Sequence, residues 1–235
     1  MKKLLLIAAT HGDEPIGLEV IKNLNDKKLS DYFDVLIGNP LALEKNERFI
    51  DYDLNRAYPG DPKSDKYELR RAAENLEVAK KYQYIIDIHK AGKGNNNFII
   101  APRPDLPTKF PLDWLSLDTV LLWPDPQGPL GGILDNCVEL EFGIMGRDYQ
   151  QVVTEATEVV ENFILAMEKN QNHSPKEKTV YRVDGTISLT DWEKDRPLPE
   201  NFQANTFQGE EFYPLLVNQY ARLGILCYKM KKINK

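Results

Sequence analysis

Leu4-Leu-Leu-Ile-Ala-Ala-Thr-His-Gly-Asp-Glu14 is the stretch that decides the fold. An apolar run that stops at a polar, glycine-containing turn is typical of a buried strand that feeds a loop. Apolar side chains then recur at helical spacing from Ile16 to Leu24, which predicts a helix after the turn. His11 and Glu14 are therefore expected where a strand meets a helix, at the strand's carboxyl end, and in open α/β sheets sites form at that edge.

The composition sets the class of protein. The chain has 235 residues and 42% hydrophobic content, enough for one large domain or a domain with a small appendage. The net charge is −6 and the basic residues form no stripe, so nucleic acid is not an expected partner. No apolar run approaches the roughly 20 residues of a membrane span, so no membrane partner is expected. Two cysteines, Cys137 and Cys227, make no disulfide framework, which favours a cytoplasmic location.

The order of the expected elements predicts an α/β fold. Apolar runs indicate strands at 33–38, 84–89, 98–101, 120–123 and 137–142, and helical spacing indicates helices at 67–82 and 152–167. Strands that alternate with helices predict a mixed, largely parallel sheet with helices on both faces, here over residues 1–170. After a polar linker, short alternating segments at 180–183, 186–189, 212–217 and 225–228 predict a small β-rich C-terminal subdomain over residues 176–235.

The three histidines limit where a metal could bind. His173 lies in the polar linker and is interpreted as a solvated loop residue, whereas His89, like His11, follows a buried strand. His11, His89 and Glu14 together have the composition of a catalytic zinc site that keeps one position for water. Asp87 would leave the strand on the same face as His89 and could orient its ring. The alternative is a surface turn and a strand that contain histidines by coincidence.

Two acids in one strand suggest a base for hydrolysis. Glu139 and Glu141 project from the same face of the strand at 137–142, among apolar neighbours. Buried acids are costly unless they are paired or functional. Glu141 is nearer the carboxyl end and is our predicted general base; the alternative is an edge strand with solvated acids.

One loop carries groups suited to an anion. Arg48, Asn55 and Arg56 lie within nine residues of sequence, and guanidinium and amide groups can hold a carboxylate. Arg48 could instead stabilise the oxyanion of a tetrahedral intermediate. The alternative is a run of surface charge.

Four motifs in order resemble one family. His11-Gly-Asp-Glu-Pro-Ile-Gly17 resembles the zinc motif of the succinylglutamate desuccinylase/aspartoacylase family, which is related to zinc carboxypeptidases. Arg48-Phe-Ile-Asp-Tyr-Asp-Leu-Asn-Arg56, Asp87-Ile-His89 and Glu141-Phe-Gly143 are similar to further signatures of the family. The resemblance spans most of the chain.

The resemblance implies a zinc-dependent amidohydrolase that removes the acyl group from an N-acyl amino acid. It implies one Zn²⁺ per chain, held by His11, Glu14 and His89. The family fold is a carboxypeptidase-like catalytic domain, here 1–170, and a small β domain that narrows the entrance to the site. The implied partner is a small-molecule substrate, and a homo-oligomer is compatible with the family.

The resemblance also implies the roles of four further residues. Glu141 would activate water and then protonate the leaving amine, and Arg48 would polarise the scissile carbonyl. Asn55 and Arg56 would bind the α-carboxylate of the substrate.

The departures from the family bear on the substrate. Lys90 follows the third ligand, where the family usually has Asn, and no arginine lies between residues 104 and 146, where aspartoacylases hold a second substrate carboxylate. This argues against aspartate or glutamate as the released amino acid, unless Arg103, Arg147 or Arg222 replaces that cation. The runner-up function is a carboxypeptidase-like hydrolase of short peptides, and a third reading is a non-catalytic metal-binding protein.

Overall fold

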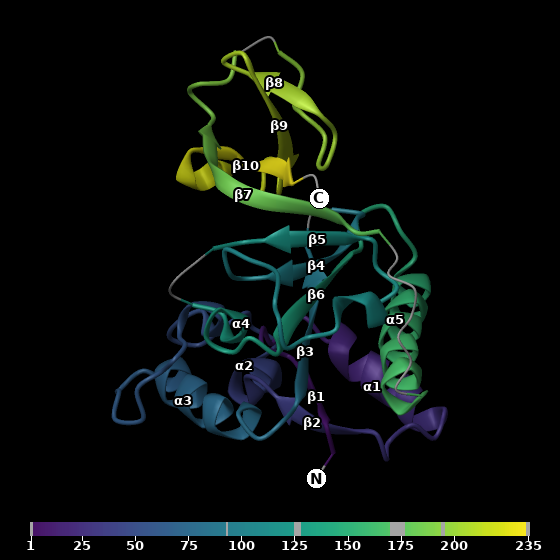
Figure 1. Ribbon diagram of the computed structural model, residues 1–235. Helices are drawn as coiled ribbons and strands as arrows, with labels where there is room; N and C mark the ends of the chain where they lie inside the picture. The colour runs from purple at the N-terminus through teal and green to yellow at the C-terminus, as the bar shows by residue number, and fades with distance from the viewer. Residues whose placement is uncertain (1, 93, 125–127, 170–176, 194–195, 234–235) are drawn as a thin grey trace.

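A ten-stranded sheet forms the framework of the protein (Figure 1). The structure is a computed structural model that describes residues 2–92, 94–124, 128–169, 177–193 and 196–233. The strands are β1 Leu4–Ala8, β2 Phe33–Ile37, β3 Tyr84–Ala91, β4 Asn97–Ala101, β5 Thr119–Leu122, β6 Cys137–Gly143, β7 Thr179–Ser188, β8 Asn205–Phe207, β9 Glu210–Leu215 and β10 Ile225–Ile233. The α-helices are α1 Ile16–Asp26, α2 Pro40–Lys45, α3 Tyr67–Ala79, α4 Leu130–Ile133 and α5 Tyr149–Lys169, and 3-10 turns are η1 Leu54–Arg56, η2 Leu112–Trp114 and η3 Ala221–Leu223.

The strand order is β2-β1-β3-β6-β4-β5-β7-β10-β9-β8. Strands β2, β1, β3 and β6 are parallel neighbours, as are β4, β5 and β7. Strand β4 runs antiparallel to β6. Because only residues 92–96 join β3 to β4, the chain has no room for a crossover helix and returns in the opposite direction.

Helices cover both faces of the sheet. Successive side chains of a strand point to opposite faces, so a continuously apolar strand gives each face an apolar surface that helices bury. Leu4, Leu6 and Ala8 of β1 face the core that contains α1 and α5. Leu5 and Ile7 face the core that contains α3. The predicted α/β fold, with a largely parallel sheet and helices on both faces, is confirmed.

The β-rich C-terminal part continues the same sheet. Strand β7 pairs in parallel with β5, and β10, β9 and β8 then add antiparallel strands (upper part of Figure 1). The two short segments predicted at 180–183 and 186–189 are one strand, β7, in which Gly185 has a φ of +124° and lies opposite a register shift in β10. Glycine adopts this φ without steric cost, so the strand bends rather than ends. The division at about residue 176 stays a prediction.

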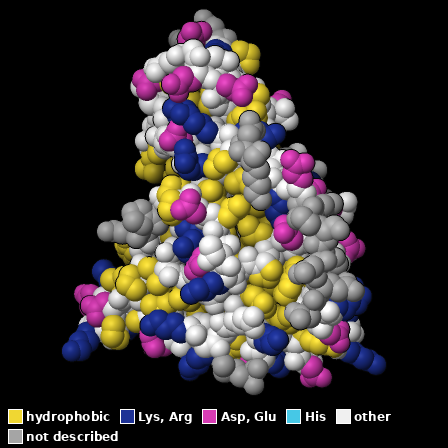
Figure 2. Space-filling model, in the orientation of Figure 1, with side chains coloured by type: hydrophobic (Ala, Val, Ile, Leu, Met, Phe, Trp, Pro, Cys, Tyr) yellow, Lys and Arg dark blue, Asp and Glu magenta, His cyan; other side chains and the backbone are white. Residues whose placement is uncertain are grey.

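The surface carries mixed charge. On the face shown in Figure 2, Lys and Arg side chains are interspersed with Asp and Glu. Neither described histidine, His11 or His89, reaches this face, because both are buried. Within the part of the chain that the structure describes, no helix is both long and apolar enough to cross a bilayer.

Candidate metal centre and the pocket around it

The loop after β1 holds His11 and Glu14 in fixed positions. It packs so closely on α2 that a Cβ added to Gly12 would lie 2.1 Å from the carbonyl carbon of Ala42. The backbone N–H of Gly12 also donates to the carbonyl of Arg48, at 3.3 Å. Only glycine fits this close approach. Gly12 therefore allows the loop to pack against α2, and this packing holds the backbone that carries His11 and Glu14.

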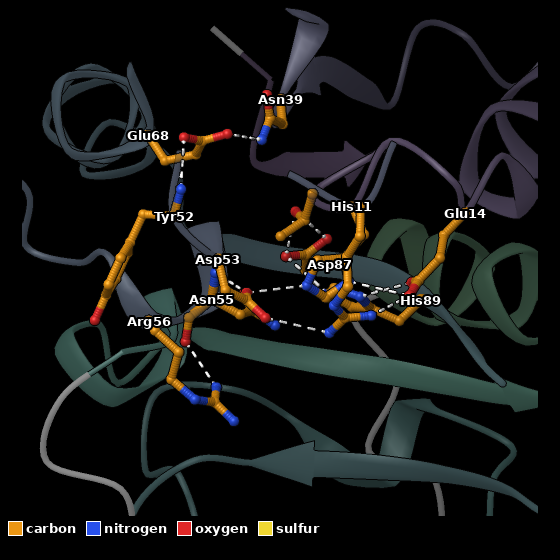
Figure 3. Close-up of polar contacts among 12 residues, drawn as sticks. His11, Glu14, Asn39, Tyr52, Asp53, Asn55, Arg56, Glu68, Asp87 and His89 are labelled. Atoms are coloured by element: carbon orange, nitrogen blue, oxygen red, sulfur yellow. Dashed lines mark hydrogen bonds and ion pairs between the residues drawn. The ribbon is translucent and has the colours of Figure 1, made fainter. Parts of the chain in front are cut away.

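His11, Glu14 and His89 form a buried cluster (Figure 3). The Glu14 carboxylate lies between the two imidazoles, with Oε1 3.1 Å from His11 Nδ1 and Oε2 3.1 Å from His89 Nδ1. One potential ligand atom from each residue lies within 4.8 Å of the others. The side chains predicted to share an ion, from two strand ends far apart in sequence, are thus brought together. His89 lies within β3 rather than at its last residue, because β3 continues to Ala91.

Two carboxylates orient the imidazole rings from outside the cluster. Asp53 Oδ1 lies 3.1 Å from His11 Nε2. Asp87 Oδ2 lies 3.1 Å from His89 Nε2, as an ion pair that is not aligned as a hydrogen bond. Thr10 Oγ1 donates to both oxygens of Asp87, at 2.8 and 3.0 Å. With Nε2 of each ring facing a carboxylate, both Nδ1 atoms face the centre of the cluster, an arrangement that is common around metal-binding histidines.

The cluster is charged in a way that suits a cation. Burial opposes the charged form of all three groups, but their mutual interactions outweigh it. The two imidazoles hold the pKa of Glu14 well below its ordinary value. Asp87 and Glu14 raise the pKa of His89 well above its ordinary value, and Asp53 and Glu14 raise the pKa of His11. A divalent cation that binds here would displace protons from the two rings.

The donor set fits zinc. Two imidazole nitrogens and one carboxylate are the ligands of catalytic zinc sites. Tetrahedral bonds of about 2.0–2.1 Å place neighbouring ligand atoms about 3.3 Å apart. Each Nδ1 atom lies 3.1 Å from one oxygen of the shared Glu14 carboxylate, Oε1 for His11 and Oε2 for His89, which is close to that spacing.

A pocket opens from the cluster. Apart from His89, the predicted site residues line it: His11, Glu14, Arg48, Asn55, Arg56 and Glu141. Much of the remaining lining is apolar, with Phe98, Ile100, Pro102, Trp123, Pro129 and Leu216. This apolar lining could not be predicted from the sequence, because β4, β5 and the loops beside them carry no motif.

The loop that ends at η1 presents its polar groups to this pocket. The guanidinium of Arg48 donates to Glu14 Oε1 at 3.2 Å and to Asp53 Oδ2 at 3.4 Å. Asn55 is buried, and among the described residues its Oδ1 has no hydrogen-bond partner. Arg56 is exposed, and its Nη1 donates to the carbonyl of Asn55 at 2.8 Å. Arg48 therefore touches the cluster, while Asn55 and Arg56 lie farther along the pocket wall.

Glu68 of α3, which sequence reasoning missed, holds this loop (Figure 3). The side chain is fully buried, and its carboxylate accepts the backbone N–H groups of Ile50, Asp51 and Tyr52 at 2.7, 2.9 and 3.1 Å. It also accepts the side-chain amide of Asn39, at 3.1 Å. In the sequence Glu68 is one more acid on an amphipathic helix. Only the packing of α3 against the loop distinguishes it.

Replacing Glu68 by Gln is expected to lower the free energy of unfolding by about 3 kcal/mol, because a carboxamide offers one acceptor oxygen where several donors now converge on two. Denaturant unfolding measures the change. Glu74→Gln is the matched control on the same helix, since Glu74 pairs with Arg71 in an exposed ion pair that contributes about 0–1 kcal/mol. Equal losses in the two variants would contradict the role given to Glu68.

The cations proposed as replacements for a missing carboxylate anchor lie outside the pocket. Arg147 pairs with Glu155, and Arg103 with Asp135. Neither of them, nor Arg222, is among the described residues that line the pocket. His173, the third histidine, lies outside the described residues.

Three more polar residues lie around the cluster: Lys90, which follows the third predicted ligand, and Gln219 and Tyr220, which no motif indicated. Lys90 lines the pocket, but its Nζ donates to the carbonyl of Asp13 at 3.0 Å. Gln219 and Tyr220 of the C-terminal part also line the pocket. Their contribution depends on how β9 and β10 return to the sheet, which no local pattern encodes.

Known proteins share both the sequence pattern and the fold. The profile of the succinylglutamate desuccinylase/aspartoacylase catalytic domain matches residues 1–167. The N-acyl-aromatic-L-amino acid amidohydrolase (carboxylate-forming) of Xenopus laevis is 29% identical over 123 residues, which are 45% of this chain and 39% of that protein. A probable aspartoacylase of Prochlorococcus marinus is 32% identical over 103 residues, covering 38% of this chain and 34% of its own length. The chain thus matches little more than a third of the length of these relatives.

A solved structure shares the fold over the whole length of this chain. The succinylglutamate desuccinylase of Chromobacterium violaceum superposes with a TM-score of 0.74 at 18% identity, covering 100% of this chain and 85% of that one. At this identity the likeness concerns the fold alone. The profile match, by contrast, extends over more than half of the sequence and includes His11, Glu14, His89 and Glu141. The chain belongs to the succinylglutamate desuccinylase/aspartoacylase family.

Proposed function

We propose that this protein is a zinc-dependent amidohydrolase that removes the acyl group from an N-acyl amino acid. The observation that carries the proposal is the buried cluster of His11, Glu14 and His89 at the base of a pocket that Glu141 also lines. The family and the names of the relatives favour this reaction over other zinc chemistry. Both cysteines are free and buried, which suits a reducing cytoplasm.

Glu141 is the proposed base. A zinc ion held by His11, Glu14 and His89 would supply a Lewis acid that makes water a nucleophile near neutral pH. Glu141 takes one proton from the attacking water while the oxygen of the water bonds to the acyl carbon. It then delivers that proton to the nitrogen as the C–N bond breaks, which yields a carboxylic acid and a free amine. Arg48 donates a hydrogen bond to the former carbonyl oxygen, which is negatively charged in the tetrahedral intermediate.

Asn55 and Arg56 are the proposed anchor of the α-carboxylate. A guanidinium can hold a carboxylate with two parallel hydrogen bonds. Asn55 adds an amide donor beside it. We further propose that residues 176–235 narrow the entrance, since Leu216, Gln219 and Tyr220 line the pocket.

Purified protein with zinc added should hydrolyse members of a panel of N-acetyl and N-succinyl amino acids. Release of the free amino acid measures the reaction, and dipeptides with a free carboxyl end test the runner-up, a carboxypeptidase-like activity. Faster release from dipeptides than from every N-acyl amino acid would replace our proposal with that alternative. A protein that binds zinc and hydrolyses neither class would contradict both.

Arg56→Ala is expected to raise KM by about 10- to 100-fold, because a charge-assisted hydrogen bond to the substrate carboxylate contributes about 1.5–3 kcal/mol. Steady-state kinetics on the best substrate of the panel measure the change. Arg182→Ala, at an exposed position of β7, is the control for loss of one positive charge. An equal KM in both variants would rule out Arg56 as the anchor.

A further inference from the structure

The pocket contains a second acid that the proposed reaction does not use. Glu139 lies two residues before Glu141 on β6, so both side chains are on the same face of the sheet. It lines the pocket, yet it is only 5% exposed. Its Oε1 is buried and has no hydrogen-bond partner among the described residues. A buried carboxylate oxygen without a hydrogen-bond partner is costly, so we expect a group from outside the chain to donate to Oε1.

The register of the sheet separates Glu139 from the reacting groups. Glu141 lies beside His89 of β3 and opposite Phe98 of β4. Glu139 lies two residues earlier on β6, beside Asp87 of β3 and opposite Ile100 of β4. Two residues of strand span about 7 Å. Glu139 is therefore placed to meet a distal part of a substrate whose amide lies beside Glu141.

The surroundings of Glu139 favour a positively charged partner. Asp87, a second acid, is its neighbour on β3. Burial, together with the charge of Asp87, raises the pKa of Glu139 to about 7, although the charges of His89, Arg56 and His11 oppose the shift. Arg48 donates to Glu14 and Asp53, and Lys90 donates to a backbone carbonyl. Arg56 also lines the pocket and donates to the carbonyl of Asn55, and its charge lowers the pKa of Glu139 without cancelling the effect of burial.

The pocket offers apolar surface near Glu139, since Ile100 lies opposite it on β4. Ile100, Pro102, Trp123 and Pro129 line the same pocket. Apolar walls accommodate the methylene stem of a long basic side chain, and the charged end can then reach an acid. A neutral aromatic side chain would fit the walls but would leave Glu139 without a partner. An acidic side chain would meet Glu139 with a like charge.

We propose that Glu139 is a specificity residue that receives the cationic amino group of the substrate's side chain, so that N-acyl derivatives of basic amino acids are the preferred substrates. This inference rests on the proposed function, whose amide-cleaving groups place the substrate in the pocket. It also accounts for the absence of Arg103 and Arg147 from the described pocket lining, since a basic side chain needs no second cation.

Two substrates that differ only at the end of the side chain test the proposal. Nα-acyl-L-lysine and Nα-acyl-L-norleucine, with the acyl group found best in the panel, are compared in the zinc-loaded protein. The wild type is expected to prefer the lysine derivative at least about tenfold in kcat/KM. Equal values, or a preference for an N-acyl aromatic amino acid, would overturn the proposal without any variant.

Glu139→Gln keeps the shape of the side chain and removes its charge. The ratio of kcat/KM for the lysine over the norleucine derivative should fall at least about tenfold in this variant. Zinc content and thermal unfolding verify that it is folded. A ratio that stays within twofold of the wild type would show that Glu139 does not read the side chain.

A binding measurement separates this inference from the proposed function. Calorimetry with free L-lysine and L-norleucine requires no turnover. If the wild type hydrolyses no N-acyl amino acid but binds lysine at least tenfold more tightly than norleucine, and Glu139→Gln removes the difference, the proposed function fails, and only the recognition of a side-chain amino group by Glu139 stands. Equal binding of the two amino acids by the wild type would overturn the inference even if hydrolysis is observed.

Discussion

Replacing Glu141 by Gln is expected to lower kcat by about 10²- to 10⁴-fold, the range for loss of a general acid–base group, while the protein still binds one zinc ion. Glu141 lies beside His89 in the sheet register and lines the pocket. Burial raises its pKa to about 7, and the nearby Glu14 and Glu139 carboxylates add to this. A group with this pKa can both accept a proton from water and return it to an amine near neutral pH.

The measurement needs zinc content and rate from the same preparation. Glu158→Gln, at an exposed position of α5, is the matched control and should retain both. Because Gln has the size of Glu and Glu141 is not a member of the cluster, zinc content should stay at about one per chain. An unchanged kcat in Glu141→Gln would remove Glu141 as the base. A loss of zinc would show that it acts through the metal site instead.

Replacing His89 by Ala is expected to abolish zinc binding, and hydrolysis with it. His89 is 1% exposed, and its Nδ1 faces Glu14 at the centre of the cluster. Removal of one of three ligands leaves too few donors for a catalytic site. The variant should also lose the stabilisation by zinc. At a free zinc concentration 100 times Kd, binding stabilises a folded protein by about 2.7 kcal/mol, which raises Tm by about 5–10 °C for a chain of this size.

Thermal unfolding with and without a chelator, together with metal analysis, measures this effect. In the wild type the chelator should lower Tm by about 5–10 °C, and in His89→Ala it should cause no shift. His173→Ala is the matched control, because His173 is the histidine that the sequence places in a polar linker. Full zinc content in His89→Ala, or loss of zinc in His173→Ala, would contradict the proposed ligand set.

The sequence was most informative where one local pattern carried both structure and chemistry. The apolar run before His11 predicts β1, and the strand-end rule predicts that His11 and Glu14 lie near His89. The structure brings these three side chains together. The prediction succeeds because parallel strands of one sheet end at the same edge, whatever their separation in sequence.

Contacts between distant segments could not be read in this way. Glu68 is spaced like any other acid of an amphipathic helix, and its burial depends on how α3 packs against the loop at 50–52. Ile100 lies opposite Glu139 because β4 pairs antiparallel with β6. A short loop after β3 permits that direction, but nothing in the sequence of β4 specifies its neighbour.

The parallel ladder between β5 and β7 also affects where the chain can be cut. Thr119 to Leu122 pair with Thr179 to Arg182, so a fragment that stopped after α5 would bare the backbone donors and acceptors of β5. An uncovered strand edge recruits strands from other molecules. Such a fragment should aggregate even though it retains all the proposed zinc ligands, and solubility therefore depends on a segment that contributes no ligand.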